Sequence, residues 1–147
     1  MRPVRVVHTF AVSVSEAELC WYDTGRWPGW VDGLDAVLET RAPWPQVGGV
    51  VRWESGPAGR GRVVETVIDY TPADGQTVQV SDDTVTARQS VSFTAVPAGV
   101  EVTLELEYRI TRRSPLTPLV DVLFVRRAMT QSLGRSLERF GLRLSGG

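Results

Sequence analysis

The sequence contains no lysine and no asparagine, and all 16 of its basic residues are arginine. Without lysine the chain cannot provide a Schiff-base nucleophile, a phosphate-loop lysine or a kinase lysine. It has one histidine, His8, and one cysteine, Cys20. This scarcity excludes a histidine-rich metal site, a zinc ribbon and an intramolecular disulfide. We therefore expect no metal and no cofactor.

The length and composition are those of a globular domain. A compact chain of 147 residues buries roughly 70% of its unfolded surface. Hydrophobic residues make up 42% and charged residues 22%, which fits neither a disordered nor a membrane protein. The N-terminus lacks the apolar run of a signal peptide. We expect a soluble, cytoplasmic protein with a single domain over residues 1–147 and no transmembrane segment.

Charge is distributed unevenly along the chain. The net charge of -1 argues against a nucleic-acid partner. Residues 1–111 carry nine arginines and fifteen acids, whereas residues 112–147 carry seven arginines and two acids. The C-terminal segment is therefore basic, although the chain as a whole is not.

The first thirty residues predict a strand followed by two short helices. Alternating apolar residues over 3–12 indicate a strand with His8 on its apolar side. Residues 13–16 have the spacing of a capping box, which predicts a helix over 14–23. A second helical turn is expected over 26–30.

From residue 34 to residue 111 the sequence alternates between strands and turns. Clusters of Gly, Pro and Asp separate runs rich in valine and threonine. The predicted strands cover residues 34–41, 50–55, 61–71, 76–82, 84–96 and 99–111. In the last of them apolar and charged residues alternate, so one face of the sheet should be dry and the other wet.

After residue 115 the hydrophobic period changes to that of a helix. Apolar residues recur every three or four positions, at Leu119, Val122, Val125, Met129, Leu133, Leu137, Phe140 and Leu144. A polar stripe follows another side, at Arg127, Gln131, Arg135, Arg139 and Arg143. This arginine face is either solvated or in weak contact with an anionic surface or a protein.

Only this long helix is apolar enough to cover the dry face of the sheet. The expected fold is α+β, with a curved seven-stranded antiparallel sheet around a long C-terminal α-helix and two short helices between strands 1 and 2. A strongly twisted sheet cannot contact a straight helix along its whole length. We therefore expect a cavity between them.

The stretch Ser13–Leu34 resembles the START-related helix-grip superfamily, in particular its polyketide cyclase/dehydrase-like branch. It contains a helix cap, a short helix, an Asp, the pattern Trp-Pro-x-Trp and a Gly-Leu that leads into the second strand. The order of elements is similar over nearly the whole chain. The resemblance implies a helix-grip fold with a pocket for an apolar or aromatic small molecule. It does not by itself imply catalysis.

Five residues are candidates for ligand binding. All the tryptophans lie between positions 21 and 53, where each can anchor a short helix or stack on a planar ligand. We expect Trp27 and Trp53 to line the pocket. Gln89, Phe93 and Tyr108 lie on the inner parity of the last two strands. The polar groups among them need a partner, which is either a ligand or another side chain.

His8 and Glu65 are the candidates for proton transfer. His8 is the only side chain with an ordinary pKa near neutrality, although a histidine on an apolar face is often a hydrogen-bonded core residue. Glu65 shares one row of its strand with Asp69, and the sequence does not decide whether that row faces inward. An inward Glu65 would be an acid or base, and an outward, solvated Glu65 is the simpler alternative.

Three functions stay open at this point. The preferred one is binding or transport of a hydrophobic or aromatic small molecule in the cavity. The second is a polyketide cyclase/dehydrase-type enzyme, whose aldol closure and loss of water need a shaped pocket and proton-transfer groups. The third is an interaction module for a protein or membrane surface, without a ligand. The sequence leaves monomer and homodimer equally open.

Overall fold

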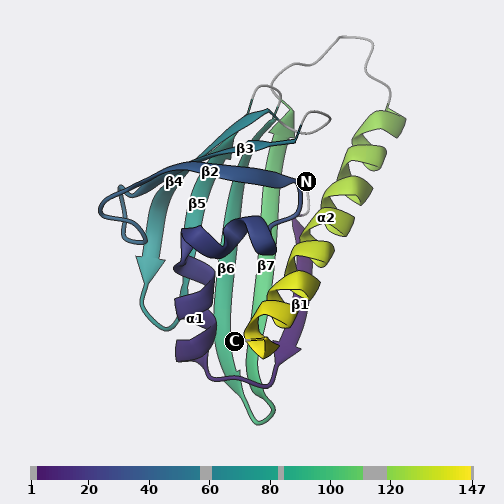
Figure 1. Ribbon diagram of the computed structural model, residues 1–147. Helices are drawn as coiled ribbons and strands as arrows, with labels where there is room; N and C mark the ends of the chain where they lie inside the picture. Colours follow the sequence, from purple (N-terminus) through teal and green to yellow (C-terminus); the bar gives the residue numbers. More distant parts are fainter. Residues whose placement is uncertain (1–2, 57–60, 83–84, 111–118, 147) are drawn as a thin grey trace.

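The computed structural model describes residues 3–56, 61–82, 85–110 and 119–146, without the side chains of residues 85, 109–110 and 119–125. Figure 1 shows its elements. They are β1 (Val4–Phe10), α1 (Val14–Tyr22), η1 (Thr24–Gly29), β2 (Leu34–Arg41), β3 (Val50–Ser55), β4 (Arg62–Thr71), β5 (Gly75–Ser81), β6 (Val85–Val96), β7 (Gly99–Ile110) and α2 (Leu119–Ser145). The bounds agree with the predicted elements to within about two residues.

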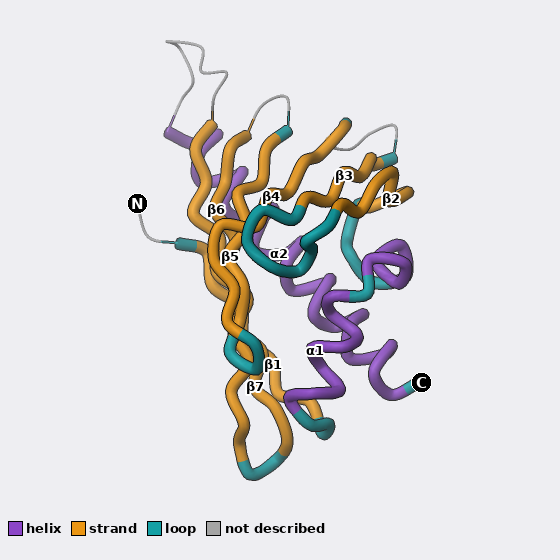
Figure 2. Tube along the Cα trace, turned by 90° about the vertical axis from the view of Figure 1, so that its left-hand side faces the viewer, coloured by secondary structure: helices purple, strands orange, loops and turns teal. Residues whose placement is uncertain are grey.

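The strands form one antiparallel sheet in the order β1-β7-β6-β5-β4-β3-β2. β1 pairs with β7, so the first and last strands are neighbours, and β2 forms the opposite edge. The three helical elements lie on one side of this curved sheet (Figure 2). The predicted α+β fold is confirmed: a seven-stranded antiparallel sheet, a long C-terminal helix and two short helices between strands 1 and 2.

Side-chain caps begin both short helical elements. The Ser13 hydroxyl accepts a hydrogen bond of 3.1 Å from the backbone N–H of Glu16, as the capping pattern predicts. The Asp23 carboxylate caps η1 by accepting a backbone N–H of its first turn. Because the caps fix where each helix begins, Trp21 and Trp27 both point into the core.

A β-bulge in β4 determines which of its residues face inward. The pairing with β5 shifts between Val67 and Asp69. Before the bulge Val63, Glu65 and Val67 are buried, and after it Tyr70 packs on the core while Asp69 is exposed. The predicted common face of Glu65 and Asp69 is therefore wrong, because an extra residue in a bulge reverses the alternation.

The C-terminal half of α2 packs into the core beside β1 and α1. Leu137 and Phe140 are fully buried. The Phe140 ring lies 5.5 Å from that of Phe10 and 5.0 Å from those of Trp21 and Trp30, measured between centroids. One side chain thus joins β1, α1 and the segment after η1.

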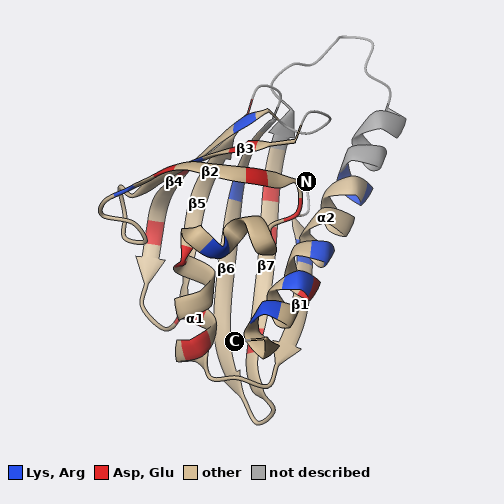
Figure 3. Cartoon of the chain, in the orientation of Figure 1, with Lys and Arg blue, Asp and Glu red and all other residues tan. Residues whose placement is uncertain are grey.

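The two predicted stripes of α2 are confirmed where the structure describes side chains. The partly buried members of the apolar stripe are Met129, Leu133 and Leu144. The first three predicted members of this stripe lie in the part of α2 whose side chains the structure does not describe, and they are Leu119, Val122 and Val125. The exposed polar stripe is Arg127, Gln131, Arg135, Arg139 and Arg143, part of the basic side visible in Figure 3. Among the described residues, no helix combines the length and apolarity that crossing a membrane requires.

Replacing Phe140 by alanine is expected to lower the free energy of unfolding by about 3 to 5 kcal/mol, because it leaves a cavity among three rings. Urea denaturation measures this change. The matched control is Leu142→Ala on the same helix, where the side chain is 70% exposed and the expected change is within about 0.5 kcal/mol. Equal stability of the two variants would contradict the role given to Phe140.

Candidate functional site

A cavity of about 70 Å³ lies between the sheet and α2, where the twist of the sheet predicts it. Side chains of α1, η1 and the loop after η1 form one part of its wall. Strands β3 to β7 form its floor, and α2 closes the remaining side. The cavity therefore lies where every layer of the fold meets.

Four of the five tryptophans line this cavity: Trp21, Trp27, Trp30 and Trp53. Trp27 and Trp53 are thus part of its wall, as the sequence predicts. The fifth, Trp44, supports the wall from behind, with its ring 5.5 Å from that of Trp27. The tryptophans anchor the short helices and face the cavity at the same time, so their anchoring role is confirmed, while stacking on a ligand stays a prediction.

Hydrogen bonds fix the orientation of two of these indole rings. The Trp27 indole N–H donates to the carbonyl of Trp21 at 2.8 Å. The Trp53 indole N–H donates to the carboxylate of Glu65 at 2.7 Å. The Trp30 indole N–H is buried and has no partner among the residues that the structure describes. Two of the indoles are therefore fixed in orientation, and one unsatisfied donor lies close to the cavity.

Glu65 faces the cavity, so the outward alternative is wrong. Its side chain is only 7% exposed, and one carboxylate oxygen accepts the hydrogen bond from Trp53. A carboxylate in this position accepts hydrogen bonds from a bound molecule or exchanges a proton with it. The bulge in β4, which lies beyond Glu65, leaves this orientation unchanged.

Two glutamines join Glu65 on the floor of the cavity, around Val78. Gln89 pairs directly with Val78 across β5 and β6, and Gln76 lies two residues before Val78 on β5. The Gln76 amide donates to the carbonyl of Pro45 at 2.9 Å. The half-buried Gln89 amide makes no side-chain hydrogen bond within the described part of the chain. The mostly apolar cavity thus has a polar floor.

His8 does not line the cavity, and the alternative of a hydrogen-bonded core histidine is wrong. It has the expected parity on β1, but its side chain is exposed and stacks on Phe10 at 5.4 Å. β1 is an edge strand, and the Phe140 ring of α2 packs on Phe10. This edge position leaves His8 open to solvent.

Phe93 and Tyr108 belong to the core and not to the cavity wall. Phe93 is buried between the rings of Trp21 and Tyr22, 6.1 Å from each. Tyr108 is partly buried against the core near the end of β7. Inner parity places a residue on the correct face of a strand but does not say where along the strand the cavity lies.

Sequence reasoning missed several residues of the wall. Gln76 carries the same signal as Gln89, a polar residue in an inward row, and could have been found in that way. Ser132 and Ser136, four apart on α2, are small polar residues beside the apolar stripe. Asp32 has no local signal at all, because its partners are about one hundred residues away.

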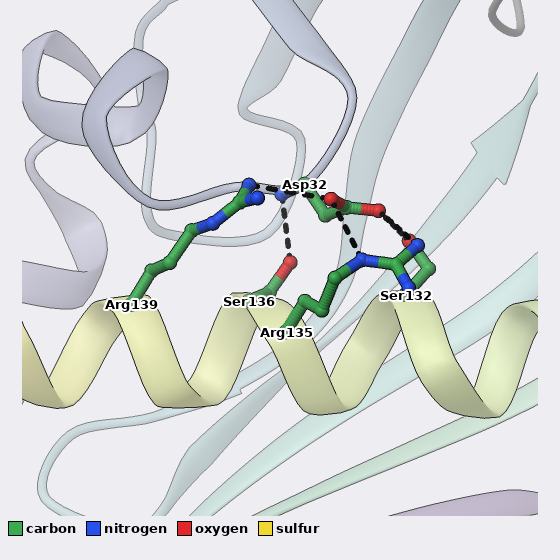
Figure 4. Close-up of polar contacts among 5 residues, drawn as sticks. All are labelled: Asp32, Ser132, Arg135, Ser136 and Arg139. Carbon is green, nitrogen blue, oxygen red and sulfur yellow. Dashed lines mark hydrogen bonds and ion pairs between the residues drawn. The ribbon is translucent and has the colours of Figure 1, made fainter.

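Asp32 connects the loop after η1 to α2 (Figure 4). Its carboxylate accepts hydrogen bonds from the Ser132 hydroxyl at 2.7 Å, from Arg135 at 3.0 and 3.2 Å and from Arg139 at 3.2 Å. Its backbone N–H donates to the Ser136 hydroxyl oxygen at 2.8 Å. Burial alone would raise the pKa of Asp32, but the hydrogen bonds and the arginine charges lower it below its usual value.

The described residues offer little for metal or thiol chemistry. No three His, Cys, Asp or Glu side chains among them come together as a metal site requires. Cys20 is buried, and this burial raises the pKa of its thiol despite a hydrogen bond with Arg26 and that residue's charge. A buried thiol with a raised pKa is a poor nucleophile.

Replacing Asp32 by asparagine should destabilise the protein in a pH-dependent way. Because folding lowers the pKa of Asp32, its contribution is present above the unfolded pKa of about 3.9 and is lost as the pH falls through the folded value. We expect a loss of about 1 to 2 kcal/mol at pH 7, limited by the half-exposed arginines, and a smaller loss below pH 4.

Urea denaturation at pH 7 and below pH 4 measures how the stability loss of Asp32→Asn depends on pH. Glu138→Gln is the matched control, since it removes an exposed carboxylate from α2. A loss at pH 7 that is the same in both variants, or that does not shrink on acidification, would contradict the assigned role of the Asp32 carboxylate.

Solved structures with the same fold cover almost the whole chain. Protein TTHA0849 from Thermus thermophilus has a TM-score of 0.79 at 14% identity, over 98% of this chain and 97% of its own. Ara h 8.0201 has a TM-score of 0.76 at 10% identity, over 99% and 98%. DynU16, a protein in the dynemicin biosynthetic locus, has a TM-score of 0.66 at 18% identity, over 99% of this chain and 48% of its own. Likeness at these identities shows the fold alone.

Among curated proteins, no sequence matches this chain. A family model does match it, over residues 1–144, and that family is described as polyketide cyclase/dehydrase and lipid transport. The match covers all the elements that form the sheet, the long helix and the cavity between them. The chain therefore belongs to the polyketide cyclase/dehydrase and lipid transport family.

Proposed function

We propose that this protein binds a hydrophobic or aromatic small molecule in the cavity between the sheet and α2. The observation that carries the proposal is a wall of four tryptophans above a floor with three polar side chains. Indole rings stack on planar ligands, and a few polar groups in an apolar pocket are typical of small-molecule sites. Membership of a family that includes lipid transport supports the same conclusion.

The floor indicates which end of the ligand is polar. Glu65 accepts hydrogen bonds, and the amide of Gln89 both accepts and donates. A planar ligand that carries a hydroxyl or N–H group can form hydrogen bonds with these side chains while its ring lies against the tryptophans. The apolar part of such a ligand points toward the tryptophans of α1 and η1 and toward Leu133 of α2, away from Glu65 and Gln89.

A second candidate function is a polyketide cyclase/dehydrase-type enzyme in the same cavity, and the inward Glu65 favours it. In an aldol closure a base removes a proton from a carbon next to a carbonyl. That carbon then bonds to a second carbonyl carbon, whose oxygen takes up a proton before water is lost. Glu65 supplies a group of the kind that accepts and returns this proton. DynU16 comes from a biosynthetic locus, which is compatible with this chemistry.

The structure gives less support to an interaction module without a ligand. Of the arginine face, Arg135 and Arg139 are paired with Asp32. Arg127 and Arg143 have no carboxylate partner within the described ranges. A contact with an anionic surface or a protein would rest on these two residues, and surface charges of this kind contribute weakly.

Filling the cavity should weaken binding of a small molecule. We expect N-phenyl-1-naphthylamine, a neutral fluorescent probe, to bind the wild-type protein at one site. Val78→Phe places a ring in the centre of the floor and should weaken binding at least about tenfold, or about 1.4 kcal/mol. Val7→Phe adds the same ring on β1, where Val7 is 39% exposed, and should leave the affinity unchanged. Unaltered affinity in the folded Val78 variant would place the probe elsewhere.

Glu65→Gln separates binding from catalysis. If the cavity is catalytic, this substitution should lower turnover of a triketide or tetraketide thioester by at least about a hundredfold, because it removes the acid/base group. Probe affinity should change little, since glutamine keeps the shape of the side chain. Glu107→Gln, at an exposed position of β7, is the control. If the wild-type protein binds the probe but converts no thioester, the proposed enzymatic function is wrong and the proposed binding function stands.

A further inference from the structure

The polar contacts of Asp32 run along the wall of the cavity. Val31 and Asp32 line it from the loop between η1 and β2, while Ser132 and Ser136 line it from α2. Asp32 bonds to Ser132 through its carboxylate and to Ser136 through its backbone N–H, as Figure 4 shows. These bonds therefore close the wall between the loop and the helix.

α2 is held by two different kinds of contact. One turn beyond Ser136, the Phe140 ring is fully buried among three other rings. The Asp32 side chain is 17% exposed, and those of Arg135 and Arg139 are 50% and 47% exposed. Water can replace hydrogen bonds at partly exposed groups, whereas buried rings have no such substitute. Loop and helix should therefore separate at Asp32 before they separate at Phe140.

Trp30 and Gly33 flank Asp32 closely in its loop. Trp30 is buried at its start. Gly33, directly after Asp32, has a φ of 80°, which is in the left-handed region that favours glycine. A Cβ at this position would have no heavy atom within 4 Å, so packing does not explain the glycine. The Leu34 backbone N–H donates to the Val31 carbonyl at 3.3 Å, so Gly33 lies in a hydrogen-bonded turn beside Asp32.

The cavity is small for a ligand site. Its volume is about 70 Å³, whereas pockets for drug-sized molecules have about 300 to 1,000 Å³. A ligand of that size needs more space, and a displacement of the wall would supply it. The polar contacts of Asp32 are the part of the wall that is easiest to displace.

We propose, on the basis of the proposed function, that a latch closes the ligand cavity and opens when a ligand enters or leaves. The latch consists of Asp32 and its four partners on α2, which are Ser132, Arg135, Ser136 and Arg139. Opening breaks the bonds of Asp32 and replaces them with bonds to water, while Phe140 keeps α2 attached to the core. Asp32 is in this account a positioning residue, because it controls access to the cavity and does not act on the ligand itself.

Stopped-flow measurements with N-phenyl-1-naphthylamine test the latch. Asp32→Asn should raise both the association and the dissociation rate constant about tenfold, because it removes charge-assisted hydrogen bonds that must break in both directions. The equilibrium affinity should change much less than either rate. Ser132→Ala removes one of these bonds and should shift both rates in the same direction by a smaller factor. Glu138→Gln is the control and should leave both rates unchanged.

A second measurement needs no ligand. Acrylamide quenches the fluorescence of tryptophans that it can reach, and four tryptophans line the cavity. Quenching should therefore increase in Asp32→Asn and Ser132→Ala but not in Glu138→Gln. If Asp32→Asn does not fold, Ser132→Ala gives the same comparison at a smaller amplitude.

The outcomes separate the latch from the proposed function. Increased quenching in a protein that binds no probe would overturn the binding function and support the latch. Probe binding with wild-type rates and wild-type quenching in both folded variants would support the binding function and overturn the latch.

Discussion

The burial of the Phe140 ring is the contact on which the rest of the structure depends. The sheet has one dry face, and where α2 covers it this ring packs against β1, α1 and the segment after η1 together. The contact fixes one end of the helix close to the sheet. Along the preceding turns the twisted sheet and the straight helix diverge, and the space between them becomes the cavity. The packing of the core and the presence of the cavity therefore both follow from where α2 contacts the sheet.

The tryptophans have structural and functional roles that cannot be separated. Trp21 and Trp30 pack on Phe140 and also line the cavity. Trp53 holds Glu65 in its inward position while presenting its own ring. Because the same side chains stabilise the core and shape the site, a substitution at any of them affects both. The polar contacts between the loop and α2 belong to the wall of the cavity but not to this aromatic core.

Local patterns in the sequence predict the fold well and the site only in part. Alternation and helical periodicity depend on neighbouring residues, so they locate the strands, the long helix and the inward rows that hold Trp53 and Gln89. They do not reveal that β1 lies at an edge, which exposes His8, or that a bulge turns Asp69 outward. Nor do they reveal Asp32, whose partners on α2 are distant in the sequence. These features depend on how whole elements meet in space.

The tryptophan wall has a practical consequence for any study of this protein. Indole emission responds to the polarity around the ring, and four of the five indoles surround one small space. The natural chain thus carries its own optical reporter of whether that space is empty, hydrated or occupied. Binding of unlabelled compounds can therefore be followed through tryptophan emission, without a dye that would itself compete for the cavity.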